Sequence, residues 1–308
     1  MKPTTAITIV RYPGASQAAI FGLQEMFLLA NSTSQQQQYN HHFECNIVEH
    51  GELTAQASCL QAVIVPPSIN HDYYLSPTPE LLQWLKLQHK QGCVVSSACA
   101  GAFILAKANL LNQRPVTTHW ALAADFAKRF PDCLLRSEQI IINDGDIITA
   151  GGLMSWVDLG LELVAQYTRP SIMRQLGKSL VVDTGPREQR YYQSFNPNFE
   201  HGDNDIIKVQ HFIQSHYQQN INVALLCEQC FLTERTLLRR FVKATGLKPI
   251  QYLQKLRVQK ACELLETSPQ STEAIAQQVG YEDAGAFRKV FIKIIGLSPR
   301  DFRRRFTK

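Results

Sequence analysis

The last third of the chain contains one sequence unit twice, and the two copies lie fifty positions apart. The clearest match pairs Gly246-Leu-Lys-Pro249-Ile-Gln-Tyr252 with Gly296-Leu-Ser-Pro299-Arg-Asp-Phe302. Phe241-Val-Lys243 and Phe291-Ile-Lys293 match at the same offset. Such a fixed offset indicates a duplicated supersecondary unit. Each copy predicts a short apolar helix, a tight turn, a second helix carrying Arg and Lys, and a Gly-x-x-Pro stop. That order is typical of a helix-turn-helix, whose second helix can enter a major groove.

The charge of the chain is distributed unevenly, although its sum is only +5. Residues 205–308 contain 17 Lys and Arg against 9 Asp and Glu, whereas residues 1–204 contain 14 against 17. A basic terminal third on a mildly acidic body indicates a polyanion-binding module joined to a domain of another kind. Charge alone also fits a solvated basic surface, and the repeat favours the first interpretation. A length of 308 residues predicts two or three domains.

Neither a membrane segment nor a metal site is expected from the sequence. No apolar run approaches the roughly 20 residues that span a bilayer, and the first residues are too polar for a signal peptide. Eight scattered cysteines fit a reducing compartment. Cys227 and Cys230 form a lone CxxC pair, whereas tetrahedral zinc needs four ligands, so both are interpreted as small core residues. We therefore predict a cytoplasmic chain without membrane contact, metal or cofactor.

The first 180 residues alternate short apolar β-rich runs with helical patterns, which predicts a doubly wound α/β sheet. Strands are expected at 7–10, 43–49, 62–65, 93–97, 140–143 and 146–150, and helices at 18–30, 80–91, 102–108 and 155–167. The polar stretch 31–40, which includes Gln35 to Gln38, is expected to be a surface insertion. Residues 184–204 are rich in Gly, Pro and polar residues and predict a linker. Everything beyond is predicted to be helical.

The second helix of each copy carries the residues expected to contact DNA. Thr233 and Asp283 stand at the N-cap positions of these helices. Arg235 and Arg239 lie four apart on one face, and a guanidinium there can donate two hydrogen bonds to guanine. A single arginine would usually mark a solvated face, but two copies at equal spacing favour DNA. The expected DNA contacts are Arg235, Thr236, Arg239, Arg240, Lys243, Arg288, Lys289, Lys293 and, on phosphates in the basic tail, Arg303.

Residues 225–306 resemble the AraC/XylS-type DNA-binding domain. The most specific segment runs from Ile275-Ala-Gln-Gln-Val-Gly280 through Phe287-Arg-Lys-Val-Phe291 to Gly296-Leu-Ser-Pro299. The resemblance implies two helix-turn-helix units, joined by a long helix at about 249–266, that read successive major grooves. Two departures stand out. Cys230 occupies the position of Gly280, which predicts a looser first turn. Gly285 occupies the position of Arg235, so the first helix is expected to read more sequence.

The stretch Val94-Val-Ser-Ser-Ala-Cys99-Ala-Gly-Ala-Phe-Ile predicts a strand that turns sharply into a helix with a thiol at the apex, the form of a nucleophile elbow. A helix N-terminus there would favour the thiolate. The alternative is a small residue packed at a tight turn. Residues 5–182 resemble the ThiJ/PfpI, or class I glutamine amidotransferase-like, fold. The resemblance is carried by Tyr12-Pro-Gly14, Val65-Pro66, the Cys99 elbow, Leu105-Ala-Lys-Ala-Asn-Leu-Leu111, Thr117-Thr-His119-Trp120 and Ile148-Thr-Ala-Gly-Gly152.

The parts that such enzymes use for catalysis are altered in this chain. Ala100 follows the thiol where the family often has His, and Ala19 fills the slot of an acid on the first helix. Pro67 lacks the N–H that an oxyanion loop donates. We therefore predict no catalytic residue and no enzyme. Cys99, His119 and Pro66 are predicted to bind a ligand beyond the carboxyl ends of the strands.

The sequence thus predicts an effector-sensing and dimerisation domain at 1–183, a linker at 184–204 and a DNA-binding domain at 205–308. The order of domains is similar to that of GlxA-type regulators. The resemblance implies a sequence-specific transcription activator controlled by a small-molecule effector, an amine or amino-acid derivative by family analogy. Its partners would be double-stranded promoter DNA, RNA polymerase and a second copy. Two alternatives stay open: a thiol-dependent amidohydrolase or glyoxalase-like enzyme with a DNA-tethering domain, and a non-specific nucleic-acid binder.

Overall fold

The computed structural model describes residues 3–53, 60–69, 72–185 and 187–307. The chain divides into two compact units, Met1–Gln189 and Arg190–Lys308. Each unit has its own apolar core: the first unit has one buried cluster and the second has two. Within the described residues, no helix is long and apolar enough to cross a membrane.

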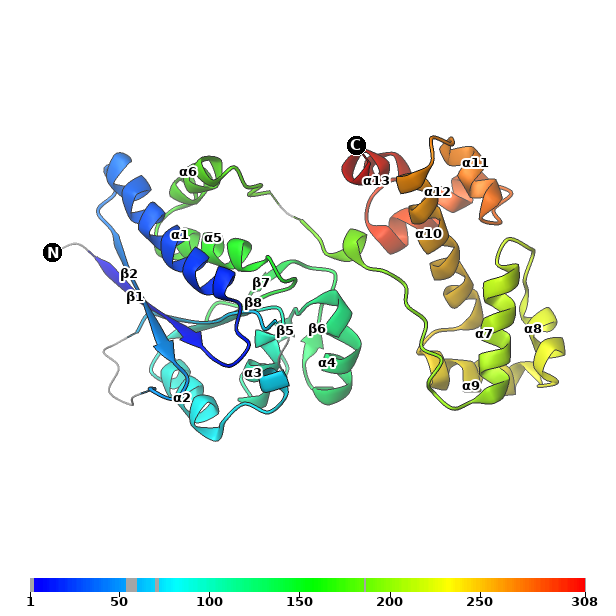
Figure 1. The fold of residues 1–308 in the computed structure, drawn as a ribbon, viewed down its shortest axis with the longest axis horizontal. Helices are drawn as coiled ribbons and strands as arrows, with labels where there is room; N and C mark the ends of the chain where they lie inside the picture. Colours follow the sequence, from blue (N-terminus) through cyan, green and yellow to red (C-terminus); the bar gives the residue numbers. More distant parts are fainter. Residues whose placement is uncertain (1–2, 54–59, 70–71, 186, 308) are drawn as a thin grey trace. The chain divides into compact units, whose positions relative to one another are not determined.

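The N-terminal unit is built on a six-stranded sheet of order β2-β1-β3-β4-β8-β7 (Figure 1). The strands are β1 (Thr4–Arg11), β2 (His42–Glu49), β3 (Ala62–Val65), β4 (Val94–Ala98), β7 (Ile141–Asn143) and β8 (Ile147–Ala150). Neighbouring strands are parallel except β7, which runs antiparallel to β8 at the edge. β3, β4 and β8 are buried along their whole length, as parallel strands covered on both faces must be. The predicted doubly wound α/β fold is confirmed.

Helices cover both faces of this sheet. Figure 1 shows α1 (Gln17–Gln36), α5 (Trp156–Tyr167) and α6 (Pro170–Leu180) on one face, with α2 (Pro79–Lys90) and α3 (Gly101–Lys107) on the other. α4 (Ala123–Arg129), α6 and a two-strand pair, β5 (Pro115–Val116) with β6 (Leu134–Leu135), were not predicted. The insertion expected at 31–40 is wrong in its first half, because α1 continues through Gln36. Thr33 and Ser34 are buried there, so tertiary packing extends the helix through the polar run.

The C-terminal unit is helical throughout, as predicted. Its helices are α7 (Asn204–His216), α8 (Val223–Cys230), α9 (Glu234–Thr245), α10 (Pro249–Thr267), α11 (Thr272–Gln278), α12 (Ala284–Ile295) and α13 (Pro299–Phe306). α10 contributes to both cores. Tyr252, Leu253 and Leu256 pack with α7, α8 and α9, whereas Val258, Ala261 and Leu265 pack with α11, α12 and α13. The long helix therefore joins the two repeats through a shared apolar spine.

The stretch 184–204, expected to be a linker, is divided between the two units. Gln189 is 3% exposed and belongs to the N-terminal unit. Tyr191, only two residues later, is buried in the core of the C-terminal unit. Phe195 packs on the other C-terminal core, and the ring of Phe199 stacks on His211. Only Arg190 thus separates Gln189, which is buried in the N-terminal unit, from Tyr191, which is buried in the core of the C-terminal unit.

Candidate DNA-binding surface and thiol site

The repeat seen in the sequence is repeated in the backbone. α9 and α12 both end at a glycine in the left-handed conformation, Gly246 with φ 72° and Gly296 with φ 84°. Glycine tolerates this conformation because it has no Cβ. The helices that follow both begin with proline, Pro249 and Pro299, whose missing N–H costs nothing at a first helical position. The Gly-x-x-Pro signal therefore separates two helices in each copy.

The outward face of α9 carries unpaired cations. Leu237 and Phe241 are fully buried and fix which side of the helix faces the core. Arg235, Arg239 and Lys243 are exposed. No hydrogen bond or ion pair of their side chains occurs within the described part of the chain. These three predicted DNA contacts are free to reach a polyanion.

Arg240, the next residue, has a different environment. Its guanidinium donates to Asp203 at 2.5 and 2.9 Å and to Asp205 at 3.0 Å. Both carboxylates lie at the start of α7. Arg240 therefore holds α7 against α9 through hydrogen bonds from Nε and Nη2, and its predicted contact with DNA remains a prediction.

The predicted cations of α12 and of the basic tail differ in their environment. Lys289 and Lys293 are exposed and unpaired within the described residues. Arg288 forms an ion pair with Glu273 of α11. Arg303 donates to the backbone oxygens of Leu265, Ser268 and Gln270, at and beyond the end of α10. Arg303 therefore fastens α13 to α10, whereas the ion pair of Arg288 lies on the surface. The predicted DNA contacts of both arginines remain predictions.

The two helix caps are in the predicted places but differ in chemistry. The carboxylate of Asp283 accepts from the N–H groups of Gly285 and Ala286, at 2.8 and 3.1 Å. Thr233 is the N-cap of α9, but its hydroxyl accepts no amide and instead donates to the hydroxyl of Thr236 at 2.9 Å. Thr236, which was predicted to contact DNA, is half-buried. The first-turn amides of α9 are thus left without a side-chain cap at the N-cap position.

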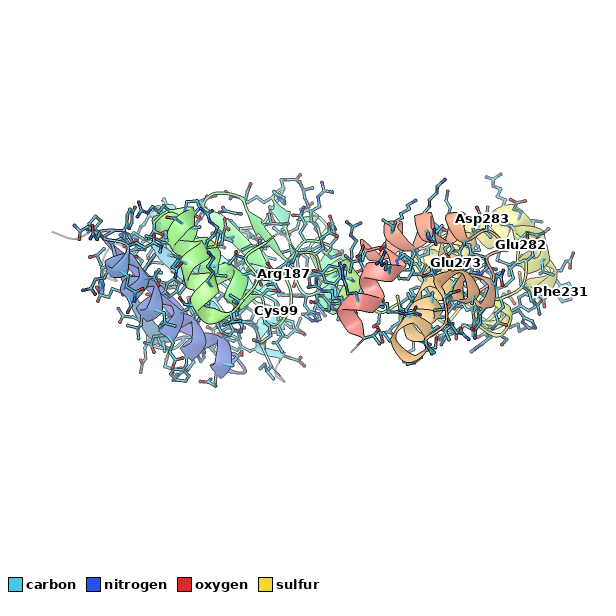
Figure 2. The ribbon with its side chains drawn as sticks, turned by 90° about the horizontal axis from the view of Figure 1, so that it is seen from above. Cys99, Arg187, Phe231, Glu273, Glu282 and Asp283 are labelled. Carbon is cyan, nitrogen blue, oxygen red and sulfur yellow. The ribbon has the colours of Figure 1, made fainter. Side chains whose placement is uncertain are left out.

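The tight turns of the two copies are also different. In the second copy Gly280 has φ +92°, and a Cβ there would lie 2.6 Å from the oxygen of Gln218. In the first copy the left-handed residue is Phe231, with φ 54°, and not Cys230. Cys230 is a buried core residue, as predicted. The left-handed residue of the first turn thus lies one position later than the alignment of Cys230 with Gly280 implies, and the looser turn remains a prediction. Phe231 is 94% exposed, and Figure 2 shows it at the margin of its unit.

The stretch around Cys99 has the backbone of a nucleophile elbow. β4 ends at Ala98, Cys99 adopts φ 54°, and α3 begins at Gly101. The N–H of Cys99 donates to the oxygen of Ala150, at the end of the neighbouring β8. A Cβ on Gly101 would lie 2.6 Å from the oxygen of Val65, so the turn needs glycine at this position. The predicted strand-turn-helix is confirmed.

The environment of the Cys99 thiol disfavours the thiolate. Cys99 is 5% exposed, and burial raises the pKa of its thiol to about 11, partly offset by a hydrogen bond from the Ala100 backbone. Tyr12 and Tyr74 are close enough to interact electrostatically with it. The expectation that a helix N-terminus would favour the thiolate is therefore wrong. Desolvation dominates, and α3 has only seven residues.

Pro66 directly follows β3 of the main sheet, whereas His119 lies in the loop after β5, which belongs to the separate two-strand pair. Pro66 is buried, and its oxygen accepts the hydroxyl hydrogen of Tyr12 at 2.5 Å. His119 is half-buried, and its Nδ1 accepts from the N–H of Ala121 at 3.1 Å. Burial lowers the pKa of His119, so its ring is neutral at pH 7. The preceding residue, Thr118, donates from its hydroxyl to the oxygen of Cys99 at 2.8 Å.

Gln189 binds this loop, and sequence reasoning missed it. Its amide nitrogen donates to Thr117 Oγ1, to the Thr118 oxygen and to the Gln139 oxygen at 2.9–3.2 Å. Its amide oxygen accepts from the N–H of Trp120 at 3.2 Å. A Cβ on Gly151 would overlap the Gln189 amide, so the glycine makes room for it. A lone glutamine in a polar stretch carries no local signal of such a role.

Comparison with known protein families identifies a related domain in each of the two units. The DJ-1/PfpI family model matches residues 33–166, and the helix-turn-helix domain model matches residues 226–305. The chain joins a DJ-1/PfpI domain to an AraC-type helix-turn-helix domain. The AraC-type domain contains both repeats described above. The DJ-1/PfpI domain contains the Cys99 elbow.

Proteins with this architecture are named as transcription regulators. The chain is 26% identical over 223 residues to the HTH-type transcriptional regulator CdhR of Pseudomonas aeruginosa, over 72% of this chain and 66% of that protein. It is 24% identical over 226 residues to the HTH-type transcriptional regulator GlxA of Rhizobium meliloti, over 72% and 68%. The chain thus spans about two thirds of the length of these curated relatives. The DJ-1/PfpI fold also matches a solved protein of Vibrio parahaemolyticus assigned to the transcriptional regulators, with TM-score 0.50, 22% identity and 58% and 99% coverage.

Proposed function

We propose that this protein is a sequence-specific, DNA-binding transcription regulator. One observation carries the proposal: Arg235, Arg239 and Lys243 share the outward face of α9 and have no partner among the residues that the structure describes. Lys289 and Lys293 repeat the second and third of these positions on α12. Cations that are exposed at equal spacing on both recognition helices match the geometry by which paired helix-turn-helix units read one duplex.

The test is a selection from random double-stranded DNA with the full chain, followed by equilibrium binding to the selected site and to a scrambled duplex. We expect a specific site that is bound at least about a thousandfold more tightly than the scrambled duplex. A non-specific nucleic-acid binder, the alternative considered above, would bind both duplexes alike, and that result would refute the proposal.

We further propose that the DJ-1/PfpI domain binds a small effector beside Cys99. Tyr12, Pro66, Cys99 and Gly151 each follow directly on β1, β3, β4 and β8, four neighbouring parallel strands. Open α/β sheets bind ligands at this edge. The proposed contacts are Cys99, Pro66 and His119. An amine or amino-acid derivative is the proposed class, on the analogy of the family.

Control by the effector would act through Gln189. Thr118 contacts Cys99 at one end and the Gln189 amide at the other. The chain enters the core of the AraC-type domain two residues after Gln189, at Tyr191. A ligand that displaces the loop 117–120 would therefore release or tighten the junction itself. Such a ligand shifts the equilibrium only as far as it prefers one state.

A thermal-shift screen of amines and amino acids tests the effector, and Gln189→Leu tests the coupling. We expect the variant to keep DNA binding and to lose the effect of the ligand on DNA affinity. Gln175→Leu, which alters an exposed glutamine on α6, is the matched control. An unchanged ligand response in Gln189→Leu would overturn the coupling and leave the DNA-binding proposal standing.

We propose that the domain has no residual hydrolytic turnover. The pKa of the Cys99 thiol is raised to about 11, and Pro66 and Pro67 offer no N–H to an oxyanion. A turnover assay with amides and 2-oxoaldehydes, with and without Cys99→Ala, separates the regulator from the amidohydrolase or glyoxalase-like enzyme. A rate that depends on the thiol would favour the enzyme.

Pairing of two copies through the DJ-1/PfpI domain is also proposed. Phe21 and Leu28 of α1 are 46% and 61% exposed and lie seven residues apart, hence on one face. Sedimentation equilibrium of the full chain and of Leu28→Glu tests this, and a dimer unaffected by the substitution would exclude the face.

Activation through RNA polymerase, proposed from the family alone, is tested by transcription in vitro from the selected site.

A further inference from the structure

Both recognition helices present an exposed aliphatic side chain among their cations. Val242 on α9 is 41% exposed and Ile292 on α12 is 46% exposed, and the two stand at equivalent positions of the repeat. Gly285, Lys289 and Ile292 are spaced i, i+4, i+7, so they form one row along α12. The buried row of the same helix is Phe287, Phe291 and Ile295. Ile292 is therefore not part of the apolar core of the domain.

In the first turn of α12, the outward row has no side chain that could form a hydrogen bond to a base. Gly285 stands where α9 has Arg235, and Ala286 stands where α9 has Thr236. The first turn of α12 thus has no side-chain donor or acceptor facing outward, apart from the capping Asp283 whose oxygens are engaged. With small residues there, the backbone of α12 is able to approach a duplex closely.

In the major groove the one apolar group on a base edge is the C5-methyl of thymine. Lys289 and Lys293 flank Ile292 at i−3 and i+1 and are free for the phosphates on either side. An aliphatic side chain between two unpaired cations complements a thymine methyl between two phosphate strands. If the partner of this face were a protein instead of DNA, it would need carboxylates opposite Lys289 and Lys293.

We propose that the second recognition helix selects thymine through the side chain of Ile292, in contrast to the arginine face of α9. This inference rests on the proposed function, because it names what the second repeat reads. It implies an asymmetric operator: one half-site read through hydrogen bonds to guanine and the other marked by thymine.

Substitution of uracil for thymine removes only the methyl group and leaves every hydrogen-bonding group in place. In the selected operator each thymine is replaced singly by deoxyuridine, and the affinity of the full chain is measured. Burial of one methyl group is worth a factor of about three to five in affinity, so we expect that loss at one or two positions of one half-site.

The same substitutions with Ile292→Ala identify the residue. This variant should bind the thymine and uracil operators alike at those positions. Ile292→Val should retain part of the preference, and Ile250→Ala, which alters an exposed isoleucine on α10, should retain all of it. Circular dichroism checks that each variant is folded.

The outcomes separate this inference from the function on which it rests. If no duplex is preferred at all, the proposed function fails. If the operator is bound specifically but uracil is tolerated everywhere in the half-site, or the loss persists unchanged in Ile292→Ala, the role of Ile292 is refuted and the regulator assignment remains.

Discussion

The guanidinium of Arg240 grips both carboxylate oxygens of Asp203, at 2.5 and 2.9 Å. Asp203 is also the N-cap of α7, where it accepts from the N–H of Ile206. One carboxylate thus caps the start of α7 and anchors α9 to it. Arg239, one residue earlier, is exposed and has no such partner in the described chain. Of these two adjacent arginines, Arg240 therefore stabilises the domain, and Arg239 is available to bind DNA.

Arg239→Ala should weaken binding to the cognate operator by about 1–3 kcal/mol and relax preference at one base pair, because a bidentate base contact is lost. Arg240→Ala should lower the midpoint of thermal unfolding and leave the base preference unchanged. Fluorescence anisotropy with the operator and its single-base variants measures the first, and calorimetry the second. Equal weakening of all sequences by Arg239→Ala would reduce Arg239 to a phosphate contact.

The Asp203–Arg240 pair also makes the AraC-type domain sensitive to acid. The hydrogen bond from Arg240 holds the pKa of Asp203 below its usual value of 3.8. The unfolded chain therefore takes up this proton at a higher pH than the folded one. The stabilisation is fully present above pH 5, declines as the pH falls through the usual value, and is lost below the folded pKa.

Urea unfolding between pH 3 and pH 7 checks this. Asp203→Asn should be less stable than the parent at pH 7 and should lose less stability on acidification. Parallel pH profiles for the two proteins would exclude Asp203 as a source of the acid dependence.

The elements that the sequence predicted well are those with a local signal. The glycine C-caps and the Cys99 elbow depend on short-range spacing, the repeat is visible as a direct match within the sequence, and all three appear in the structure. Asp203 with Arg240 and Gln189 with Thr118 are 37 and 71 residues apart, and no local pattern joins them. Tertiary pairing, which the sequence does not show, therefore decides which of the predicted arginines have a partner within the protein.

The pKa of Cys99 illustrates the same limit. The elbow was read correctly from small residues around a thiol, yet the sequence alone favoured a thiolate. The structure buries the thiol, and the resulting desolvation raises its pKa. Val242 and Ile292 were discoverable, because the offset of fifty that aligns Arg239 with Lys289 aligns them as well.

Phe231→Gly should stabilise the AraC-type domain. A bulky residue at φ 54° carries left-handed strain of about 1–2 kcal/mol, which glycine relieves, less the entropy that glycine adds to the unfolded chain. The ring is 94% exposed, so little burial is lost. A net gain of about 1 kcal/mol is expected from these principles in chemical unfolding.

Two variants control for this. Phe231→Ala removes the ring but keeps the Cβ, so it should give little gain. Gly280→Ala in the second turn should destabilise, since its Cβ would lie 2.6 Å from the Gln218 oxygen. A Phe231→Gly domain less stable than the parent would mean that the ring has a packing role.

Alkylation of Cys99 should be slow at neutral pH and should accelerate steadily with alkali. With a pKa of about 11, roughly one thiol in ten thousand is ionised at pH 7, and the rate should rise about tenfold per pH unit up to pH 9. Iodoacetamide labelling followed by mass spectrometry of the Cys99 peptide measures this, with Cys99→Ala assigning the signal. A catalytic thiol needs a pKa near or below the working pH, so the pH dependence of alkylation tests whether Cys99 could act as an enzyme nucleophile. A rate that levels off below pH 8 would reveal a thiolate despite burial and would return the DJ-1/PfpI domain to the enzymes. A rate that keeps rising up to pH 9 is the result expected for a protonated thiol that lines a binding site and does not act as a nucleophile.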